Sequence, residues 1–421
     1  MRTFTKGIFL LGILFLINFL SPLFVNADAE RENEILSLKI ALIGPGTPLY
    51  FWWGHIGLLA EGELIGTSRF YDWGIFDFND DNFLYNFTMG DLIFYCAVSP
   101  ADWHINYLVQ DNRDIIFYTL DLDLETKLEI LRFAENNILP ENRRYNYHHF
   151  RDNCATRIRD ILDMAVGGQF YAELGNAPGR FTLREQLRRH THQSPFFDWF
   201  LNFLMGQNID VPITAWDDMF LPSEVIRNAL DFEYTDRAGS RRPLISHVEY
   251  INASQNRPVI LDEPYALWPL LLVFSLLISI VLFLFYFFVH KRKCFMPIMG
   301  SLNILLGLFF GITGSLLFFM SFFSAHDYSF NNANIIFINP LLLTAIPLGI
   351  TMGFTKNMRK RLRALRFLRM LWSYVFLSGV LSMLIKLFPA YYQENHFTHA
   401  LVLPFVISMV VILTLFYWRK T

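Results

Sequence analysis

One cysteine in this sequence stands where a helix would activate a nucleophile. Asp152 and Asn153, both good N-cap residues, directly precede Cys154. Apolar residues then recur at the three- and four-residue spacing of one buried helical face, at Ile158, Ile161, Leu162 and Ala165. The sequence therefore predicts Cys154 in the first turn of a helix, where unpaired amides and the macrodipole stabilise a thiolate.

A nucleophilic cysteine needs a base, and the best one precedes it by roughly a hundred residues. His55 is flanked by glycine and opens an apolar run that resembles a strand. Two other interpretations of Cys154 stay open: a small buried apolar residue, or a disulfide to Cys96. The chain has 3 cysteines in all, too few for a disulfide framework.

A third residue should orient the imidazole, and Asp72 is the residue we expect to do so. It follows the His55 strand within the aromatic segment 70–78, which we expect to form a neighbouring strand. A carboxylate on a strand can equally well be solvated. His148 and His149 are adjacent, point apart on a strand and lack a spaced carboxylate partner, so we expect no metal and no cofactor.

The elements around these residues predict an α+β domain. Alternating apolar residues and strand-like runs predict strands near residues 36–42, 55–59, 70–78, 92–98 and 114–120. Helices follow at residues 124–138, at Cys154, at 183–190 and at 223–230. We expect an antiparallel sheet packed against the nucleophile helix.

The N-terminus reads as an export signal. Arg2 and Lys6 precede an apolar run from Ile8 to Val25, and small residues follow it. Residues 1–27 are therefore expected to be a signal peptide or an uncleaved anchor. Residues 28–263 should then form an extracytoplasmic catalytic domain.

Residues 264–421 are expected to form a transmembrane domain. Its five apolar stretches, at residues 264–290, 296–324, 334–354, 367–388 and 399–418, can each cross a hydrocarbon layer of about 30 Å. Basic residues at 291–293, 356–366 and 419–420 all fall on the side opposite residues 28–263. The positive-inside rule thus places the C-terminus in the cytoplasm. The polar loop 326–340, rich in asparagine, either caps helices or forms a docking surface for a lipid headgroup or the catalytic domain.

Several of these motifs together resemble the bacterial Lnb-type family. They are Trp53–Gly57, Tyr71–Phe78, Pro140–Tyr145, Asp152–Arg157 and the Asn-Pro pair at 339 and 340. The resemblance covers most of residues 35–260 and, more loosely, the C-terminal helices. It implies a circularly permuted papain-like, or NlpC/P60-like, domain in which the histidine precedes the cysteine, joined to a multi-span membrane domain. At the place of Asp72 this family more usually has asparagine.

The activity that the resemblance implies is lipoprotein N-acylation at the bacterial plasma membrane. An acyl chain would pass from a phospholipid, through a thioester on Cys154, to the α-amine of a diacylglyceryl-cysteine lipoprotein. Its partners would be the phospholipid donor, the diacylated lipoprotein and membrane lipids, with no nucleic acid.

Three residues are expected to bind substrate. Asn153 and Arg157 flank the nucleophile and are assigned to an oxyanion or headgroup site, although cap and salt-bridge roles explain them equally well. Tyr71 is also expected to contact the substrate.

Two alternatives remain. The same catalytic pair would serve a membrane-anchored cysteine peptidase or amidase that acts on cell-wall peptides. A non-catalytic membrane receptor or scaffold would have a buried Cys154 with no imidazole near it.

Overall fold

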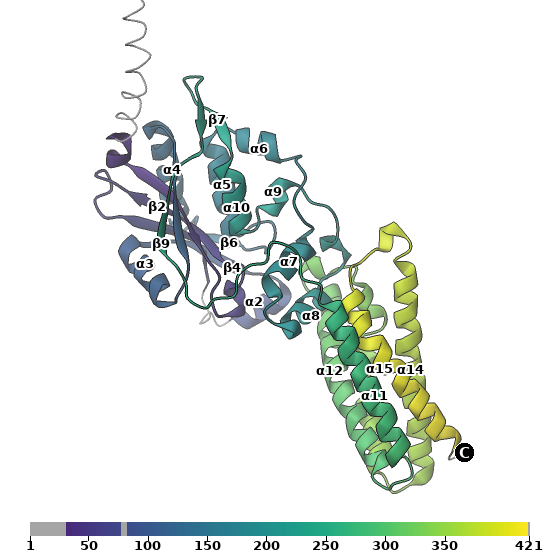
Figure 1. The fold of residues 1–421 in the computed structure, drawn as a ribbon. Helices are drawn as coiled ribbons and strands as arrows, with labels where there is room; N and C mark the ends of the chain where they lie inside the picture. Colours follow the sequence, from purple (N-terminus) through teal and green to yellow (C-terminus); the bar gives the residue numbers. More distant parts are fainter. Residues whose placement is uncertain (1–30, 77–81, 420–421) are drawn as a thin grey trace, which may run out of the picture. The chain divides into compact units, whose positions relative to one another are not determined.

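The computed structural model describes residues 31–76 and 82–419, so the expected signal segment 1–27 and the end of the aromatic segment, residues 77 and 78, lie outside it (Figure 1). The chain divides into two compact units. The sheet unit comprises Met1–Asp80, Leu92–Arg180 and Ile213–Pro258. The helical unit comprises Asp81–Asp91, Phe181–Pro212 and Val259–Thr421.

A seven-stranded sheet forms the centre of the sheet unit, with strand order β6-β4-β3-β2-β1-β5-β9. Every neighbouring pair is antiparallel. The strands are β1 (Ser37–Ile43), β2 (His55–Glu61), β3 (Arg69–Ile75), β4 (Ile93–Pro100), β5 (Ile115–Leu120), β6 (Arg144–Asn146) and β9 (Ile245–Asn252). A short hairpin of β7 (Glu233–Thr235) and β8 (Arg241–Pro243) stands apart from it.

Helices pack on both faces of the sheet. One face packs against α4 (Leu124–Asn137), α5 (Cys154–Ala165) and α10 (Pro222–Leu230), and the core between them includes Ile56, Leu58 and Ile158. The other face packs against α3 (Ala101–Gln110) through Phe70, Phe117 and other buried apolar residues. Smaller helices are α6 (Gln169–Leu174) and α9 (Ala215–Asp218). The predicted antiparallel sheet with a nucleophile helix packed against it is confirmed.

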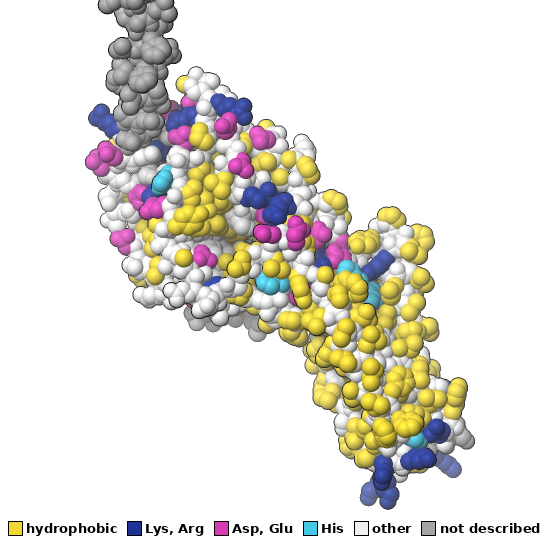
Figure 2. All heavy atoms as spheres, viewed as in Figure 1, with side chains coloured by type: hydrophobic (Ala, Val, Ile, Leu, Met, Phe, Trp, Pro, Cys, Tyr) yellow, Lys and Arg dark blue, Asp and Glu magenta, His cyan; other side chains and the backbone are white. Residues whose placement is uncertain are grey.

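The helical unit contains the five predicted membrane spans. Within the described part of the chain, five helical segments are long and apolar enough to cross a membrane: α11 (Trp268–Val289), α12 (Phe295–Phe323), Ala333–Phe354, α14 (Met358–Ile385) and α15 (His396–Trp418). The third is interrupted, because the turns η4 (Ala333–Ile336) and η5 (Pro340–Thr344) precede α13 (Ala345–Phe354). Figure 2 shows apolar side chains covering this bundle and Lys and Arg side chains gathered at one end of it.

Three short helices from the first 263 residues also belong to the helical unit. They are α2 (Phe83–Met89), α7 (Leu183–Thr191) and α8 (Pro195–Leu204). On α8, Trp199 stacks on Phe309 of α12 with ring centroids 5.6 Å apart, and Phe203 is fully buried. The helical unit therefore includes residues that precede position 264 in the chain.

The asparagine-rich loop of the helical unit serves to hold α8. Asn332 and Asn334 donate side-chain hydrogen bonds of 2.9 and 3.0 Å to the Phe203 carbonyl oxygen, and Asn334 is fully buried. Asn339 accepts a hydrogen bond from the Leu341 amide at the start of η5. These side chains are internal or capping groups, which agrees with the capping interpretation of this loop.

Candidate active site

Cys154 begins α5, as its capping residues predict. Its side chain is 9% exposed, at the edge of the core between α5 and the sheet. Cys96, Cys154 and Cys294 are all free thiols, so the alternative of a disulfide between Cys96 and Cys154 is wrong. The cysteine is therefore available as a nucleophile in the first turn of a helix.

Asn153 is fully engaged in holding this turn. Its side-chain oxygen accepts hydrogen bonds from the amides of Ala155 and Thr156 at 2.9 and 3.0 Å. Its side-chain nitrogen donates to the carbonyl oxygens of His149 and Phe220 at 2.8 and 3.0 Å. Asn153 therefore has no donor left for a substrate oxyanion, and its position fits the cap role rather than the substrate role.

The backbone amide of Cys154 is the better placed oxyanion donor. The next three amides of α5, at Ala155, Thr156 and Arg157, all bond to Asn153. The Cys154 amide makes no such bond within residues 31–76 and 82–419. An amide in this position can stabilise negative charge on a carbonyl oxygen that Cys154 attacks.

His55 is the first residue of β2, and a glycine sets its position. Gly54 has a φ of +74°, and a Cβ there would lie 2.8 Å from the Ile43 carbonyl oxygen. This turn out of the preceding loop therefore requires glycine. The His55 side chain is 18% exposed, and its Nε2 shares a 2.8 Å hydrogen bond with Asp72 Oδ1.

Charge and burial oppose each other at His55. Burial acts to lower the pKa of the imidazole, but the Asp72 carboxylate and then the adjacent Cys154 raise that pKa well above its ordinary value. Burial acts to raise the pKa of Asp72, whereas the charge and hydrogen bond of His55 bring it below its usual value. The two shifts indicate a protonated imidazole held between the Asp72 carboxylate and the sulfur of Cys154.

Two residues of this site were missed by the sequence analysis. At Gly74 on β3 a Cβ would lie 2.7 Å from His55 Cε1, so only glycine leaves room for the ring. His104 on α3 stacks on Phe70 with ring centroids 4.0 Å apart, and it interacts electrostatically with Asp72. It lies on the face of the sheet opposite α5. The Trp-Gly pair directly after Asp72 was a sequence signal for Gly74, whereas no local pattern marks His104.

The structure does not place Arg157 and Tyr71 as free substrate ligands. Arg157 donates two hydrogen bonds, of 2.6 and 2.7 Å, to Asp152, and its guanidinium lies 4.5 Å from the ring centre of Tyr145. Tyr71 is fully buried and its hydroxyl donates to Glu135 on α4. Arg157 therefore acts in a salt bridge beside the nucleophile, and Tyr71 acts in the core.

Tyr145 is the other side chain close to Cys154. Its hydroxyl donates a 2.7 Å hydrogen bond to the Trp73 carbonyl oxygen on β3. Burial, and then the neighbouring Cys154, raise the pKa of this phenol, so Tyr145 is neutral at physiological pH. Tyr145 thus connects β6 to β3 beside the nucleophile without adding charge.

The arrangement is suited to transfer through a covalent intermediate. It provides a thiol nucleophile, an imidazole that exchanges protons with it, a carboxylate that orients the imidazole, and a spare backbone amide. Among the described residues there is no group of three or more His, Cys, Asp or Glu side chains placed to hold a metal. His148 instead accepts hydrogen bonds from the amides of Phe150 and Arg151.

Comparison with known proteins gives one match. Residues 26–189 match the family model described as the Lnb N-terminal periplasmic domain. No curated protein and no solved structure matches the chain. The matched segment includes β1 to β6 and α5, and with them His55, Asp72 and Cys154.

Proposed function

We propose that this chain, whose residues 26–189 match the Lnb N-terminal periplasmic domain and whose described part contains five candidate membrane-spanning helices, is a lipoprotein N-acyltransferase. Its donor is a phospholipid, and its acceptor is the α-amine of a diacylglyceryl-cysteine lipoprotein. The observation that carries the proposal is the placement of Cys154 at a helix N-terminus beside His55, which is bonded to Asp72.

In the first half-reaction Cys154 takes the acyl group. Its thiolate attacks the carbonyl carbon of a phospholipid ester, and the resulting oxyanion accepts a hydrogen bond from the Cys154 amide. The carbon–oxygen ester bond then breaks, and the imidazolium of His55 gives its proton to the departing alkoxide. The products are a Cys154 thioester and a lyso-phospholipid.

In the second half-reaction the lipoprotein takes the acyl group. The α-amino group has a reference pKa of about 8, so an appreciable fraction of it is the neutral, nucleophilic amine at neutral pH. The amine attacks the thioester carbon and gives its proton to His55, and the carbon–sulfur bond breaks to restore the Cys154 thiolate. Asp72 keeps the imidazole oriented through both proton transfers.

The expected membrane topology agrees with this chemistry. Both substrates lie in the outer leaflet of the plasma membrane, on the side where a periplasmic domain would meet them. We place the C-terminus in the cytoplasm, because residues 291–293, 356–366 and 419–420 carry the basic clusters.

Mass spectrometry of a mature lipoprotein tests the proposal. Cells that lack their own N-acyltransferase would express the chain, its Cys154→Ser variant or a Cys294→Ser control, and the N-terminal lipopeptide would be measured. The chain and the control should add a third acyl chain, and Cys154→Ser should not.

A folded, membrane-inserted wild-type chain that adds no acyl chain would contradict the proposal. The membrane-anchored peptidase or amidase would then be tested by release of cell-wall peptides. The receptor alternative is disfavoured by the position of His55 beside Cys154.

A further inference from the structure

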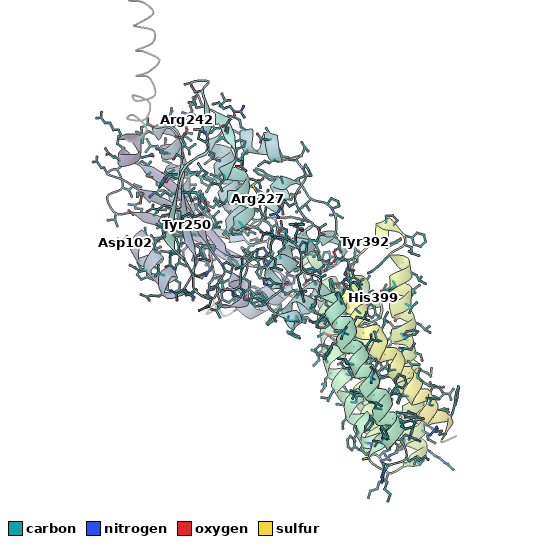
Figure 3. The ribbon with its side chains drawn as sticks, viewed as in Figure 1. Asp102, Arg227, Arg242, Tyr250, Tyr392 and His399 are labelled. Carbon is teal, nitrogen blue, oxygen red and sulfur yellow. The ribbon has the colours of Figure 1, made fainter. Side chains whose placement is uncertain are left out.

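The helical unit has a polar cluster at one end of its bundle, far along the chain from Cys154. Lys386 caps the C-terminus of α14, and the connection to α15 follows it. Figure 3 shows Tyr392 and His399 at this end of the bundle. The helix α7 contributes Arg184 and Arg188 to the same cluster, and we call this group of side chains the α14–α15 cluster.

Lys386 has no partner of its own in this cluster. Within the described chain its ammonium group makes no hydrogen bond or ion pair, although the charges of Asp210, Arg184 and Glu394 act on it. Burial lowers the pKa of Lys386 to about 8, and Asp210 acts in the opposite direction. A half-buried ammonium without a carboxylate in contact is unfavourable unless another anion approaches it.

The neighbouring carboxylates are already engaged. Both oxygens of Asp210 accept hydrogen bonds from Arg184, at 2.5 and 3.0 Å, and Arg184 is fully buried. Glu394 accepts a hydrogen bond from Arg188. Arg184 thus engages both oxygens of Asp210 and Arg188 engages one oxygen of Glu394, and neither carboxylate makes an ion pair with Lys386 in the described chain.

Arg188 adds a second unsatisfied donor. It is 4% exposed, and its two terminal nitrogens donate to Glu394 and to the Tyr265 carbonyl oxygen. Its Nε is buried without a hydrogen-bond partner in the described chain. A buried donor without a protein partner calls for an explanation, and an ordered water or a bound anion is one.

His396 stands beside these two donors at the start of α15. Its Nε2 lies 3.7 Å from Glu394 Oε1, beyond hydrogen-bond length, and its side chain is 40% exposed. The cluster thus has three donor groups, on Lys386, Arg188 and His396, for an acceptor-rich anion.

Large apolar side chains surround the same end of the bundle. Trp268 is 40% exposed, and the α14–α15 connection exposes Leu387, Phe388 and Tyr391 by 77%, 64% and 59%. Aromatic residues at span ends mark the membrane interface. A ligand at this place would have an anionic group next to apolar chains.

We infer that Lys386, Arg188 and His396 bind the phosphate of a phospholipid headgroup, with its acyl chains against Leu387 and Phe388. The planar guanidinium and the ammonium are the side-chain groups that most often bind phosphate oxygens. The inference concerns the helical unit alone and does not depend on acyl transfer at Cys154.

Lipid retention by the full-length chain tests the site. The chain would carry Cys154→Ser to prevent turnover, and native mass spectrometry would count bound phosphatidylglycerol or diacylglycerol with the same acyl chains. We expect phosphatidylglycerol to be retained and diacylglycerol not. Lys386→Gln should weaken retention about tenfold, which is the effect of losing one charge-assisted contact.

Two variants serve as controls. Lys356→Gln removes an exposed lysine from the loop before α14, at the other end of that helix, and should leave retention unchanged. Lys386→Arg keeps the charge and should retain phosphatidylglycerol.

Three results would overturn the inference. Equal retention of diacylglycerol would mean that the chains, not the phosphate, are recognised. Equal loss with Lys356→Gln would mean a general charge effect. Displacement of the lipid by millimolar inorganic phosphate would mean that the cluster takes free phosphate rather than a headgroup.

Discussion

The His55 imidazole is held by one carboxylate, and that contact decides its charge. The Asp72 carboxylate raises the pKa of His55 against the effect of burial. A histidine with a raised pKa keeps its proton at neutral pH and loses it only as the pH rises through the raised value. The protonated ring then places a positive charge beside the sulfur of Cys154, where an anionic nucleophile would form.

Asp72→Asn should therefore slow the alkylation of Cys154 at neutral pH. The variant removes the charge that raises the pKa of His55, so the positive charge beside the Cys154 sulfur is lost at a lower pH. A shift of one pKa unit corresponds to about a tenfold change in the ratio of protonated to neutral imidazole at a given pH. The rate of carbamidomethylation by iodoacetamide, followed by mass spectrometry from pH 5 to 9, measures this effect.

The other thiols provide the internal controls. The measurement uses a Cys294→Ser background, because Cys294 is exposed. Cys96 is buried, and burial raises its pKa to about 12, so it should stay unmodified in both proteins. An unchanged rate profile at Cys154 would show that Asp72 does not set the charge of His55.

Gly74→Ala should abolish most of the acyl transfer without unfolding the chain. The added methyl would lie 2.7 Å from His55 Cε1 and would push the ring away from Asp72 and Cys154. A misplacement of about 1 Å can reduce a rate roughly hundredfold. The fraction of triacylated lipoprotein, compared with the thermal unfolding midpoint, measures both effects.

Gly66→Ala is the matched control. A Cβ at Gly66 would meet no atom of the described residues within 4 Å, although the φ of +74° makes alanine strained there. This control should lose about 1 kcal/mol of stability and keep its activity. Equal activity of the two variants would remove the steric role assigned to Gly74.

At the scale of the elements, the stability of α5 depends strongly on its N-cap residue, Asn153. Asn153 accepts from two amides and donates to two carbonyl oxygens, at His149 and Phe220. Asn153→Ala should reduce the free energy of unfolding by about 2 kcal/mol, since a lost cap and buried unpaired carbonyls both contribute. The thermal unfolding midpoint of the full chain, followed by intrinsic fluorescence, measures the loss.

Thr182→Ala is the control that removes an N-cap alone. It distinguishes the loss of capping from the loss of the two side-chain hydrogen bonds that Asn153 donates to carbonyl oxygens. Thr182 caps α7 through a capping box with Glu185, but among residues 31–76 and 82–419 it donates to no distant carbonyl oxygen. Its loss should cost about 1 kcal/mol. If Asn153→Ala were no more harmful than Thr182→Ala, the two donor bonds would contribute nothing to stability.

Another element, α8, shows why chain order misleads. Its apolar run lies within residues 28–263, which the sequence analysis treats as one domain. In the structure its end is bonded to Asn332, Asn334 and Gln393, more than a hundred residues later in the chain. A hydrophobic run predicts burial but does not say against which partner.

For the whole molecule, the orientation in the membrane can be tested with its own cysteine. Cys294 is exposed and follows the basic residues 291–293, which we assign to the cytoplasm. An impermeant maleimide should therefore label Cys294 only after spheroplasts are permeabilised. A cysteine introduced by Tyr391→Cys, at the other end of the spans, should be labelled in intact spheroplasts.

Both positions are needed for the comparison. Tyr391 is 59% exposed, so its replacement is accessible unless the membrane or the cytoplasm protects it. Labelling of Cys294 in intact spheroplasts would reverse the orientation that we propose.

By itself, the sequence determined the features that depend on neighbouring residues. The N-cap before Cys154, the strand that begins at His55 and the five apolar stretches are all local patterns, because capping, alternation and hydrophobic length act over a few residues or one helix. These patterns were enough to predict an antiparallel sheet, a nucleophile helix and a multi-span helical region.

Only the tertiary structure decided how those residues are used. It brought Asp72 Oδ1 to 2.8 Å from His55 Nε2, and it engaged both polar side-chain atoms of Asn153 in hydrogen bonds. It also packed the His55 ring against Gly74, where a side chain would not fit. It also placed α8 with the membrane helices. Each of these outcomes depends on contacts between segments far apart in the chain, and hydrogen-bond partners and free space are properties of the folded packing.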